Sequence, residues 1–512
     1  MQRIANAFLG MNWGMRTCAV VVLCVTTAVA LPAQTFTTLH SFCSGGGSCT
    51  DGSAPVAGLV QATNGDFYGT TPNGGAGSYC GGGCGTVFRI TPSGRLTTLN
   101  SFAGSPTDGA NPFAGLVQAT NGDFYGTTFY GGVNCAPYGC GTVFKITPSG
   151  TRTTLHFFAG SPTDGAQPYA GLVQAPNGDL YGTTGGGGAG GAGGLGGTVF
   201  KITPSGALTT LYNFCDTNGC GYGGWDPRGG LVQATNGDFY GTTVWGGGGS
   251  LPIAGCASSG CGTVFKITPS GTSFANLYAF GGTGNPNDGA LPYAGLVQSA
   301  NGDFYGTTVY GGFNNGSHPY GSGTVFKITP SGALTILYGF CAQVNCTDGE
   351  NPYAGLVQAT DGNLYGTTSS TIFKITPTGT LTTLYSFCAQ SYCADGEGSQ
   401  AALVQGTNGD FYGTTTSGGA FGSGTVFSLS VGLGPFVETR PTSGVVGRFV
   451  EILGTNLTGA ISVSFDGTAA VFEVVASSLI LTKVPAGAST GRVQVVTPSG
   501  TLSSNVPFRV LP

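Results

Sequence analysis

The chain has 512 residues, of which only 7 % are charged, and its formal net charge is −5. No basic patch exists to attract nucleic acid, which argues against a nucleic-acid-binding protein. No run of acidic residues indicates a disordered tail. The 97 glycines lack a collagen period and stand at fixed positions between aromatic, β-branched segments, which indicates a folded protein with Gly-rich loops.

Residues 1–33 are predicted to be a secretory signal peptide. Two arginines provide the positive flank, and residues 19–30 form an apolar run that is short for a membrane span. Small residues allow cleavage after Ala30 or Ala33. The alternative is an uncleaved N-terminal anchor. We expect a secreted or cell-surface protein with no transmembrane segment after signal cleavage.

A repeated unit follows, and it is clearest in residues 115–158. The unit contains four short segments rich in aromatic and β-branched residues, which favour strands: GLVQA, DFYGTT, GTVFKIT and TTLHFF. The first two are joined by Asn121-Gly122, which suits a tight hairpin, and the last two by the turn at residues 147–150. Four antiparallel strands per repeat at this period are typical of a β-propeller blade.

The repeat occurs seven times, with its variable length mainly between the second and third segments. The last copy stops near Val431 without its fourth segment, whereas Thr35–Phe42 supplies a spare one. We therefore predict a seven-bladed propeller of four-stranded blades over residues 34–431, with the N-terminal strand closing the last blade. The repeats begin at Gly58, Gly115, Gly171, Gly230, Gly295, Gly355 and Ala402.

From residue 435 to 512 the repeat is absent and no cysteine occurs. Alternating apolar and polar segments are separated by Gly, Asn, Asp and Pro turns. This pattern predicts a C-terminal immunoglobulin-like β-sandwich.

The repeat unit closely resembles the GloVer tandem repeat of exported bacterial "choice-of-anchor" proteins, from about Thr35 to Val431. Residues 438–457, with Phe465–Thr468 and Val484–Gly487, resemble an IPT/TIG immunoglobulin-like domain. The first resemblance implies an exported surface protein whose C-terminal attachment varies, and the second a spacer or binding module. Neither implies an activity, so no catalytic residue is carried over.

Fourteen of the sixteen cysteines follow the signal peptide as seven close couples. In an exported chain such couples predict local disulfides. The chain has only three histidines, and none forms a zinc-spaced set with a couple, so we expect no metal site. The couples are Cys43/Cys49, Cys80/Cys84, Cys135/Cys140, Cys215/Cys220, Cys256/Cys261, Cys341/Cys346 and Cys388/Cys393.

Two polar positions recur in the repeats. An aspartate such as Asp164 precedes most repeat starts by seven residues, and Asp226 precedes the fourth by four. These aspartates could ring a channel and hold Ca²⁺, but acceptance of backbone N–H bonds in a turn is the favoured interpretation. A glutamine such as Gln118 recurs in the first strand, and we expect it to hydrogen-bond a neighbouring blade.

Four aromatic residues are the candidate binding groups: Tyr130, Trp225, Trp245 and Tyr310. They stand on the face that carries the long loops, where rigid rings could stack on sugars or anchor a protein, although packing of the loops is the somewhat favoured interpretation.

No catalytic pattern stands out, and no cofactor is expected. The sequence therefore predicts a monomeric binding or structural protein that engages extracellular glycan or protein. The alternative function is that of a secreted polysaccharide-active lyase or hydrolase with its site on the same face.

Overall fold

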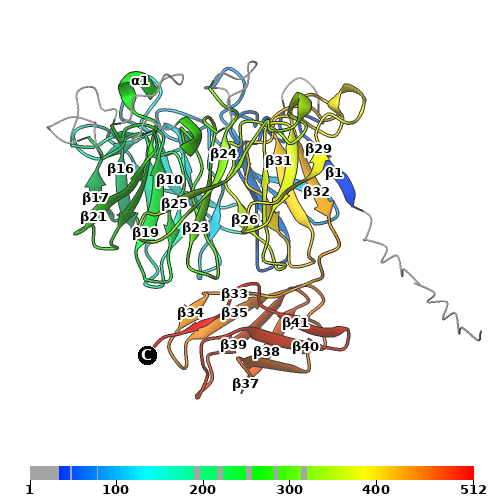
Figure 1. Ribbon diagram of the computed structural model, residues 1–512. Helices are drawn as coiled ribbons and strands as arrows, with labels where there is room; N and C mark the ends of the chain where they lie inside the picture. Colours follow the sequence, from blue (N-terminus) through cyan, green and yellow to red (C-terminus); the bar gives the residue numbers. More distant parts are fainter. Residues whose placement is uncertain are drawn as a thin grey trace, which may run out of the picture. The chain divides into compact units, whose positions relative to one another are not determined.

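The computed structural model describes residues 34–45, 49–77, 79–189, 196–215, 223–248, 256–281, 286–312 and 320–512. The signal peptide predicted for residues 1–33 lies outside the described residues. The described chain is all-β: its helices are α1 (Cys256–Ser259) and three single 3₁₀ turns (Figure 1). None of these helices is long and apolar enough to cross a membrane.

Seven four-stranded antiparallel sheets account for the repeats, and we call them the first to seventh repeat sheets. Within each sheet the strands keep the order in which they occur in the unit. The first three sheets are β2 (Val60–Gln61), β3 (Phe67–Thr71), β4 (Thr86–Ile90) and β5 (Leu96–Ser101); β7 (Val117–Gln118), β8 (Phe124–Thr128), β10 (Thr142–Ile146) and β11 (Arg152–Phe157); and β13 (Val173–Gln174), β14 (Leu180–Thr184), β16 (Thr198–Ile202) and β17 (Leu208–Asn213). The next three are β18 (Val232–Gln233), β19 (Phe239–Thr243), β20 (Thr263–Ile267) and β21 (Phe274–Ala279); β22 (Val297–Gln298), β23 (Phe304–Thr308), β24 (Thr324–Ile328) and β25 (Leu334–Gly339); and β26 (Val357–Gln358), β27 (Leu364–Thr367), β28 (Thr371–Ile375) and β29 (Leu381–Ser386).

The seventh repeat sheet is built from both ends of the repeat region. Strands β30 (Val404–Gln405), β31 (Phe411–Thr415) and β32 (Thr425–Ser430) come from the last repeat, and β1 (Thr35–Ser41) forms the outer edge. Strand β1 pairs antiparallel with β32, with Thr37 opposite Ser428. The expected pairing of the N-terminal strand with the last repeat is therefore present.

The apolar core lies between neighbouring sheets. Because side chains alternate along a strand, the Phe and Tyr of the second strand point to opposite faces of their sheet. Tyr68 of the first sheet stacks on Phe124 of the second, with ring centroids 4.1 Å apart. Phe67 stacks on Tyr412 of the seventh sheet at 4.0 Å. The glycine that follows this pair cannot be replaced without a clash, since a Cβ on Gly126 would lie 2.7 Å from the Phe144 ring.

Buried hydrogen bonds also join each sheet to the next. The hydroxyl of the first threonine after Phe-Tyr-Gly donates to a backbone carbonyl just before the next first strand. The pairs are Thr70 to Ala114, Thr127 to Ala170, Thr183 to Gly229, Thr242 to Ala294, Thr307 to Ala354, Thr367 to Ala401 and Thr414 to Ala57. The last of these pairs joins the seventh sheet to the first.

The first-strand glutamine makes a second set of such bonds, as the sequence predicted. Its side-chain oxygen accepts a backbone N–H of the preceding sheet, as Gln118 does from Thr63 at 3.0 Å and Gln61 from Thr407 at 2.9 Å. Six boundaries carry this bond. The third and fourth sheets cannot form it, because Pro176 occupies the donor position and has no N–H.

At the boundary between the third and fourth sheets the first strands are also further apart than at five other boundaries. The Thr183 bond there is 3.5 Å long, the longest of its set. A Cβ placed on Gly230 would lie 4.0 Å from the carbonyl oxygen of Gly171, whereas the equivalent distance at five other boundaries is 2.5 to 3.4 Å.

Long and short connections are segregated. The long ones, including α1 and the 3₁₀ turns η1 (Pro286–Asp288), η2 (Val344–Cys346) and η3 (Ser391–Cys393), lie at the upper ends of the repeat sheets in Figure 1. Two-residue ribbons cross this region: β6 (Gly109–Ala110) pairs with β9 (Tyr130–Gly131), and β12 (Gly165–Ala166) with β15 (Gly186–Gly187). We call this side of the repeat sheets the loop face.

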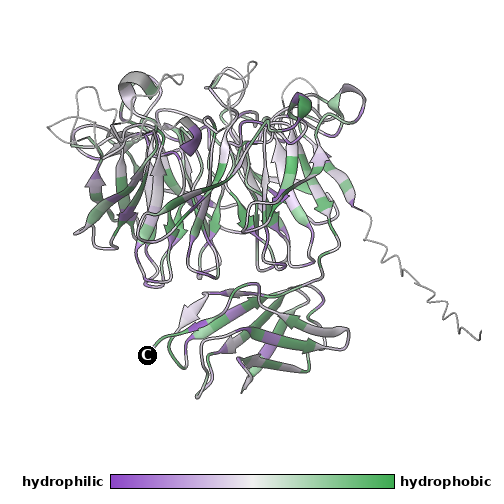
Figure 2. Cartoon of the chain, viewed as in Figure 1, coloured by the Kyte–Doolittle hydropathy of each residue, from purple (hydrophilic) through white to green (hydrophobic). Residues whose placement is uncertain are grey.

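The C-terminal residues form a sandwich of short strands with its own core. Val450, Ile452, Val463, Phe465 and Ile480 are among its buried side chains, and hydrophobic residues concentrate on its strands in Figure 2. The strands are β33 (Glu438–Arg440), β34 (Ser443–Gly444), β35 (Phe449–Leu453), β36 (Ser462–Phe465), β37 (Thr468–Ala470), β38 (Phe472–Ala476), β39 (Leu479–Lys483), β40 (Val493–Thr497), β41 (Gly500–Ser503) and β42 (Arg509–Val510).

Deletion of residues 35–42 should cause aggregation or loss of cooperative unfolding, because it leaves β32 as an unpaired edge and uncovers apolar surface around Phe427 and Leu429. Light scattering and thermal unfolding measure this. Truncation before Pro435 is the control and should leave the repeat sheets folded, since none of their strands comes from the C-terminal residues. A soluble deletion variant that unfolds like the full chain would contradict the prediction.

Candidate functional site

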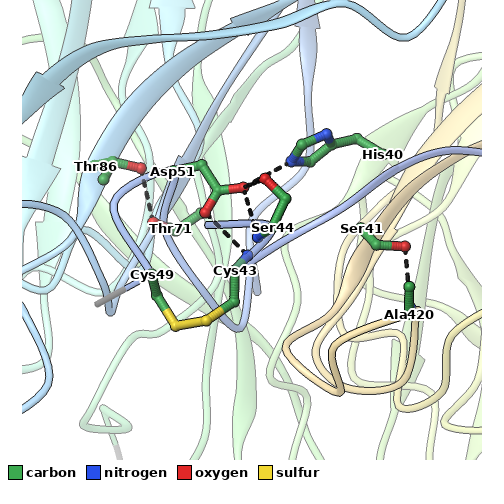
Figure 3. A network of polar contacts seen from close by, with 9 residues as sticks. All are labelled: His40, Ser41, Cys43, Ser44, Cys49, Asp51, Thr71, Thr86 and Ala420. Atoms are coloured by element: carbon green, nitrogen blue, oxygen red, sulfur yellow. Dashed lines mark hydrogen bonds and ion pairs between the residues drawn. A yellow bond between two sulfur atoms is a disulfide. The ribbon is translucent and has the colours of Figure 1, made fainter. Parts of the chain in front are cut away.

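In most repeats the aspartate that precedes the first strand holds the loop that follows an outer strand, and in three cases this loop contains a cysteine couple. In the seventh sheet, Asp51 accepts a hydrogen bond from the backbone N–H of Cys43 at 2.9 Å and from the Ser44 hydroxyl at 3.0 Å (Figure 3). His40 Nε2, on β1, lies 3.0 Å from the same carboxylate. The interpretation of these aspartates as backbone N–H acceptors is thus confirmed for Asp51.

The same arrangement recurs in other sheets, where the outer-strand partner is a histidine or a tyrosine. Asp164 accepts from the backbone of Ala159 and lies 2.8 Å from His156 Nε2. Tyrosine hydroxyls take this role in three later sheets: Tyr278 to Asp288, Tyr338 to Asp348 and Tyr385 to Asp395. These carboxylates are therefore engaged within their own sheets and do not converge on a common ion site. The third histidine, His318, lies outside the described residues.

Six of the predicted cysteine couples are disulfides: Cys43–Cys49, Cys80–Cys84, Cys135–Cys140, Cys256–Cys261, Cys341–Cys346 and Cys388–Cys393. Cys215 is disulfide-bonded, and its predicted partner Cys220 lies outside the described residues. Glu350 and Glu397 each place a carboxylate near one couple. The sulfurs there are oxidised, and a disulfide sulfur is not the thiolate that binds metals.

The four aromatic residues predicted as binding groups are half-buried on the loop face. Tyr130, Trp245 and Tyr310 occupy equivalent positions in three sheets, each paired with the segment before the first strand. Trp225 is the partner of Trp245, and their rings stack with centroids 5.8 Å apart. These rings therefore pack against loop segments, and none is among the fully exposed aromatics.

Arg228 lies at the centre of a larger group of rings that the sequence analysis did not single out. Its guanidinium carbon lies 5.0 Å from the centroid of Tyr169 and 5.2 Å from that of Tyr293, which is cation–π distance. Its Nε donates to Asp226 at 2.9 Å. The Trp245 side chain also hydrogen-bonds to Asp226, so a predicted binding residue is linked to Arg228 through this carboxylate.

Further rings extend this group on both sides. Phe113 stacks on Tyr169 at 5.0 Å and meets Phe129 edge-on, and Phe129 contacts Tyr130. On the other side Tyr353 meets Tyr293 at 5.6 Å and shares a hydrogen bond with Tyr310. We call this set the Arg228 cluster: Phe113, Phe129, Tyr130, Tyr169, Asp226, Arg228, Trp245, Tyr293, Tyr310 and Tyr353.

Burial sets the charge states of the Arg228 cluster. It raises the pKa of Tyr169, Tyr293 and Tyr353 above the ordinary value, so these phenols are neutral at physiological pH and can donate hydrogen bonds. Burial also raises the pKa of Asp226, and the Arg228 guanidinium opposes that rise. The cluster therefore offers one cation, one carboxylate and several neutral hydroxyls.

A signal for this cluster does exist in the sequence. Five of its members stand two residues before the first-strand glycine of their repeats, and four more lie within two residues after the second strand. Aligning that first position across the repeats gives Val56, Phe113, Tyr169, Arg228, Tyr293, Tyr353 and Gln400. Most of these side chains are bulky, and all stand just before a first strand, which indicates a shared surface. The sequence analysis used only the second position.

A family model described as the Gloeobacter/Verrucomicrobia repeat matches residues 25–250, 136–370 and 315–451. An IPT/TIG domain model matches residues 437–510. No curated protein sequence matches the chain.

Solved structures with similar folds share little sequence with the chain. PorZ, an essential bacterial surface component of the type-IX secretion system of Porphyromonas gingivalis, is 14 % identical over 88 % of this chain and 58 % of its own, with a TM-score of 0.41. A luciferin-regenerating enzyme is 10 % identical over 75 % of this chain and 94 % of its own, with a TM-score of 0.39. A structure of a nidogen/laminin complex is 13 % identical over 57 % and 87 %, with a TM-score of 0.35. Similarities at this level carry no argument about function.

Asp395→Ala should lower the free energy of unfolding by about 3 kcal/mol, because Asp395 is fully buried and its loss leaves Tyr385 and the backbone N–H groups of Ala389 and Gln390 without their acceptor. Chemical denaturation of the full chain measures the change. Glu397→Gln, an exposed charge two residues away, should change it by less than about 0.5 kcal/mol. Equal effects of the two substitutions would refute this role for Asp395.

Peptide mapping without reductant should recover all seven cysteine couples as disulfides within couples, including the predicted Cys215–Cys220 bond. Each bond closes a loop of only four to six residues in the six pairs seen. Free thiols, or bonds between different repeats, would count against the prediction.

Proposed function

The chain belongs to the Gloeobacter/Verrucomicrobia repeat family, and on that premise we propose that it is an exported surface protein that binds an extracellular glycan on its loop face. The observation that carries the proposal is the Arg228 cluster. Half-exposed aromatic rings from five consecutive repeat sheets meet there, around a fixed guanidinium. Flat apolar faces beside hydroxyl and carboxylate groups are suited to sugar rings, which present apolar C–H faces and polar edges.

We further propose that the repeat sheets form a closed seven-bladed β-propeller over residues 34–431, which an immunoglobulin-like domain follows at 435–512. The β1–β32 pairing and the Thr414–Ala57 bond support closure. A closed ring would bring the residues before the seven first strands around one opening, and this is why side chains from several sheets could act on one ligand.

Export is proposed from the predicted signal peptide at residues 1–33 and is supported by the disulfides, which persist in oxidising compartments. A cytosolic location would leave these couples reduced. The alternative function, a secreted polysaccharide-active enzyme, has no specific support in the Arg228 cluster, because its one carboxylate is bound to Arg228 and Trp245.

Screening of the full chain on a glycan array, followed by calorimetry on the hits, should reveal carbohydrate binding that Tyr169→Ala and Tyr293→Ala each weaken by about tenfold, since each removes one ring of the cluster. Tyr392→Ala is the matched control: Tyr392 is 99 % exposed on another loop and belongs to no cluster, so its loss should leave affinity unchanged.

Absence of any glycan hit, or equal affinity of all three variants, would refute the proposal. Cleavage of a bound glycan during the measurement would instead favour the enzyme.

A further inference from the structure

One position of the Arg228 cluster differs in charge from its equivalents in the other repeats. Two residues before the first-strand start, six repeats carry valine, phenylalanine, tyrosine or glutamine, and only the fourth carries a cation, Arg228. The conserved geometry of the repeat therefore places a single guanidinium among neutral side chains. A basic residue at that point is not needed for packing, because the other six sheets form without one.

The surroundings of Arg228 fix its orientation. Asp226 accepts from Nε, and the planes of Tyr169 and Tyr293 flank the guanidinium carbon. The η nitrogens make no hydrogen bond with the part of the chain that the structure describes, and the side chain is 30 % exposed. An arginine held in this way presents parallel N–H groups whose spacing matches the two oxygens of a carboxylate.

We propose that the Arg228 cluster recognises an acidic saccharide, with the η nitrogens of Arg228 donating to a sugar-borne carboxylate while the pyranose ring lies against Tyr169 or Tyr293. This inference rests on the proposed function and narrows its ligand class from glycans in general to glycans that contain uronic acid. Asp226 acts as a positioning residue, because it holds Nε and contacts no ligand in this arrangement.

The composition of the Arg228 cluster favours a sugar over an acidic peptide. An acidic peptide carries successive charges on a flexible chain and is normally bound by several cations. This cluster has one cation and several rings with neutral hydroxyls, which suit one carboxylate on a rigid, hydroxyl-bearing ring.

Calorimetry with two matched probes tests the inference: a uronic-acid-containing tetrasaccharide, and the same tetrasaccharide after reduction of its carboxylates to alcohols. The full chain should bind the acidic probe about tenfold more tightly. Arg228→Gln should abolish this preference, so that the variant binds the two probes with equal affinity. Asp226→Asn keeps an acceptor for Nε but removes the competing negative charge, so it should tighten binding of the acidic probe about threefold.

Arg89→Gln is the matched control for loss of one positive charge. Arg89 lies on the third strand of the first sheet, paired with Asp66 of a short turn, away from the loop face. The Arg89→Gln substitution should leave the affinities for both probes unchanged. The unfolding midpoint of each variant shows whether that variant is folded.

Equal affinity of the full chain for the two probes would overturn the acidic-saccharide inference and leave glycan binding intact. The inference would also be overturned if Asp226→Asn bound the acidic probe more weakly than the unmodified chain does. Tighter binding of a poly-glutamate peptide than of the acidic probe would overturn it too. If the full chain bound neither probe and no glycan on the array, the proposed function would be overturned as well.

Discussion

Each repeat sheet has two apolar faces and no means of burying them alone, and the rest of the structure depends on this constraint. The adjacent Phe and Tyr of the second strand point to opposite sides, so every sheet needs a neighbour on each side. At five boundaries the Tyr of one sheet stacks on the Phe of the next, and at two a leucine replaces the phenylalanine. A linear array would leave two such faces in water, whereas here Phe67 of the first sheet stacks on Tyr412 of the seventh.

Polar contacts then determine what the loop face can be. Where a cysteine loop follows an outer strand, the aspartate of the next repeat holds that loop to the strand, through His40 in one sheet and Tyr385 in another. These carboxylates therefore stabilise the fold through contacts within the chain. The fourth repeat departs from this plan: its aspartate, Asp226, stands three residues later and pairs with Arg228, and the binding surface proposed here arises at that departure.

Much of the architecture could be predicted because the repeat occurs seven times in the sequence. A strand pattern that is weak in one copy, such as GLVQA, becomes decisive when it recurs with the same turns, and the missing fourth segment of the last repeat indicated the role of residues 35–42. The partner of each aspartate could not be predicted, because it depends on which outer-strand side chain faces the loop. The Arg228 cluster was not predicted from the sequence, for a related reason. Its members before the first strands are 56 to 65 residues apart in sequence and become neighbours only when successive sheets are placed side by side. A search for aromatics within single loops therefore found Tyr130 and Trp245 but not Tyr169 or Tyr293.

Pro176 gives the array a mechanical asymmetry. At the boundary where it stands, the glutamine bond is missing, the threonine bond is the longest of its set, and the first strands are further apart than at five other boundaries. Fewer and longer hydrogen bonds hold the fourth sheet, which carries Arg228, against the third, which carries Tyr169, than hold the other sheets to their neighbours. An imposed distortion should therefore concentrate at this boundary. The spacing between the Arg228 guanidinium and the Tyr169 ring is therefore more compliant than the spacing between Arg228 and Tyr293 on the other side, where both inter-sheet hydrogen bonds are present.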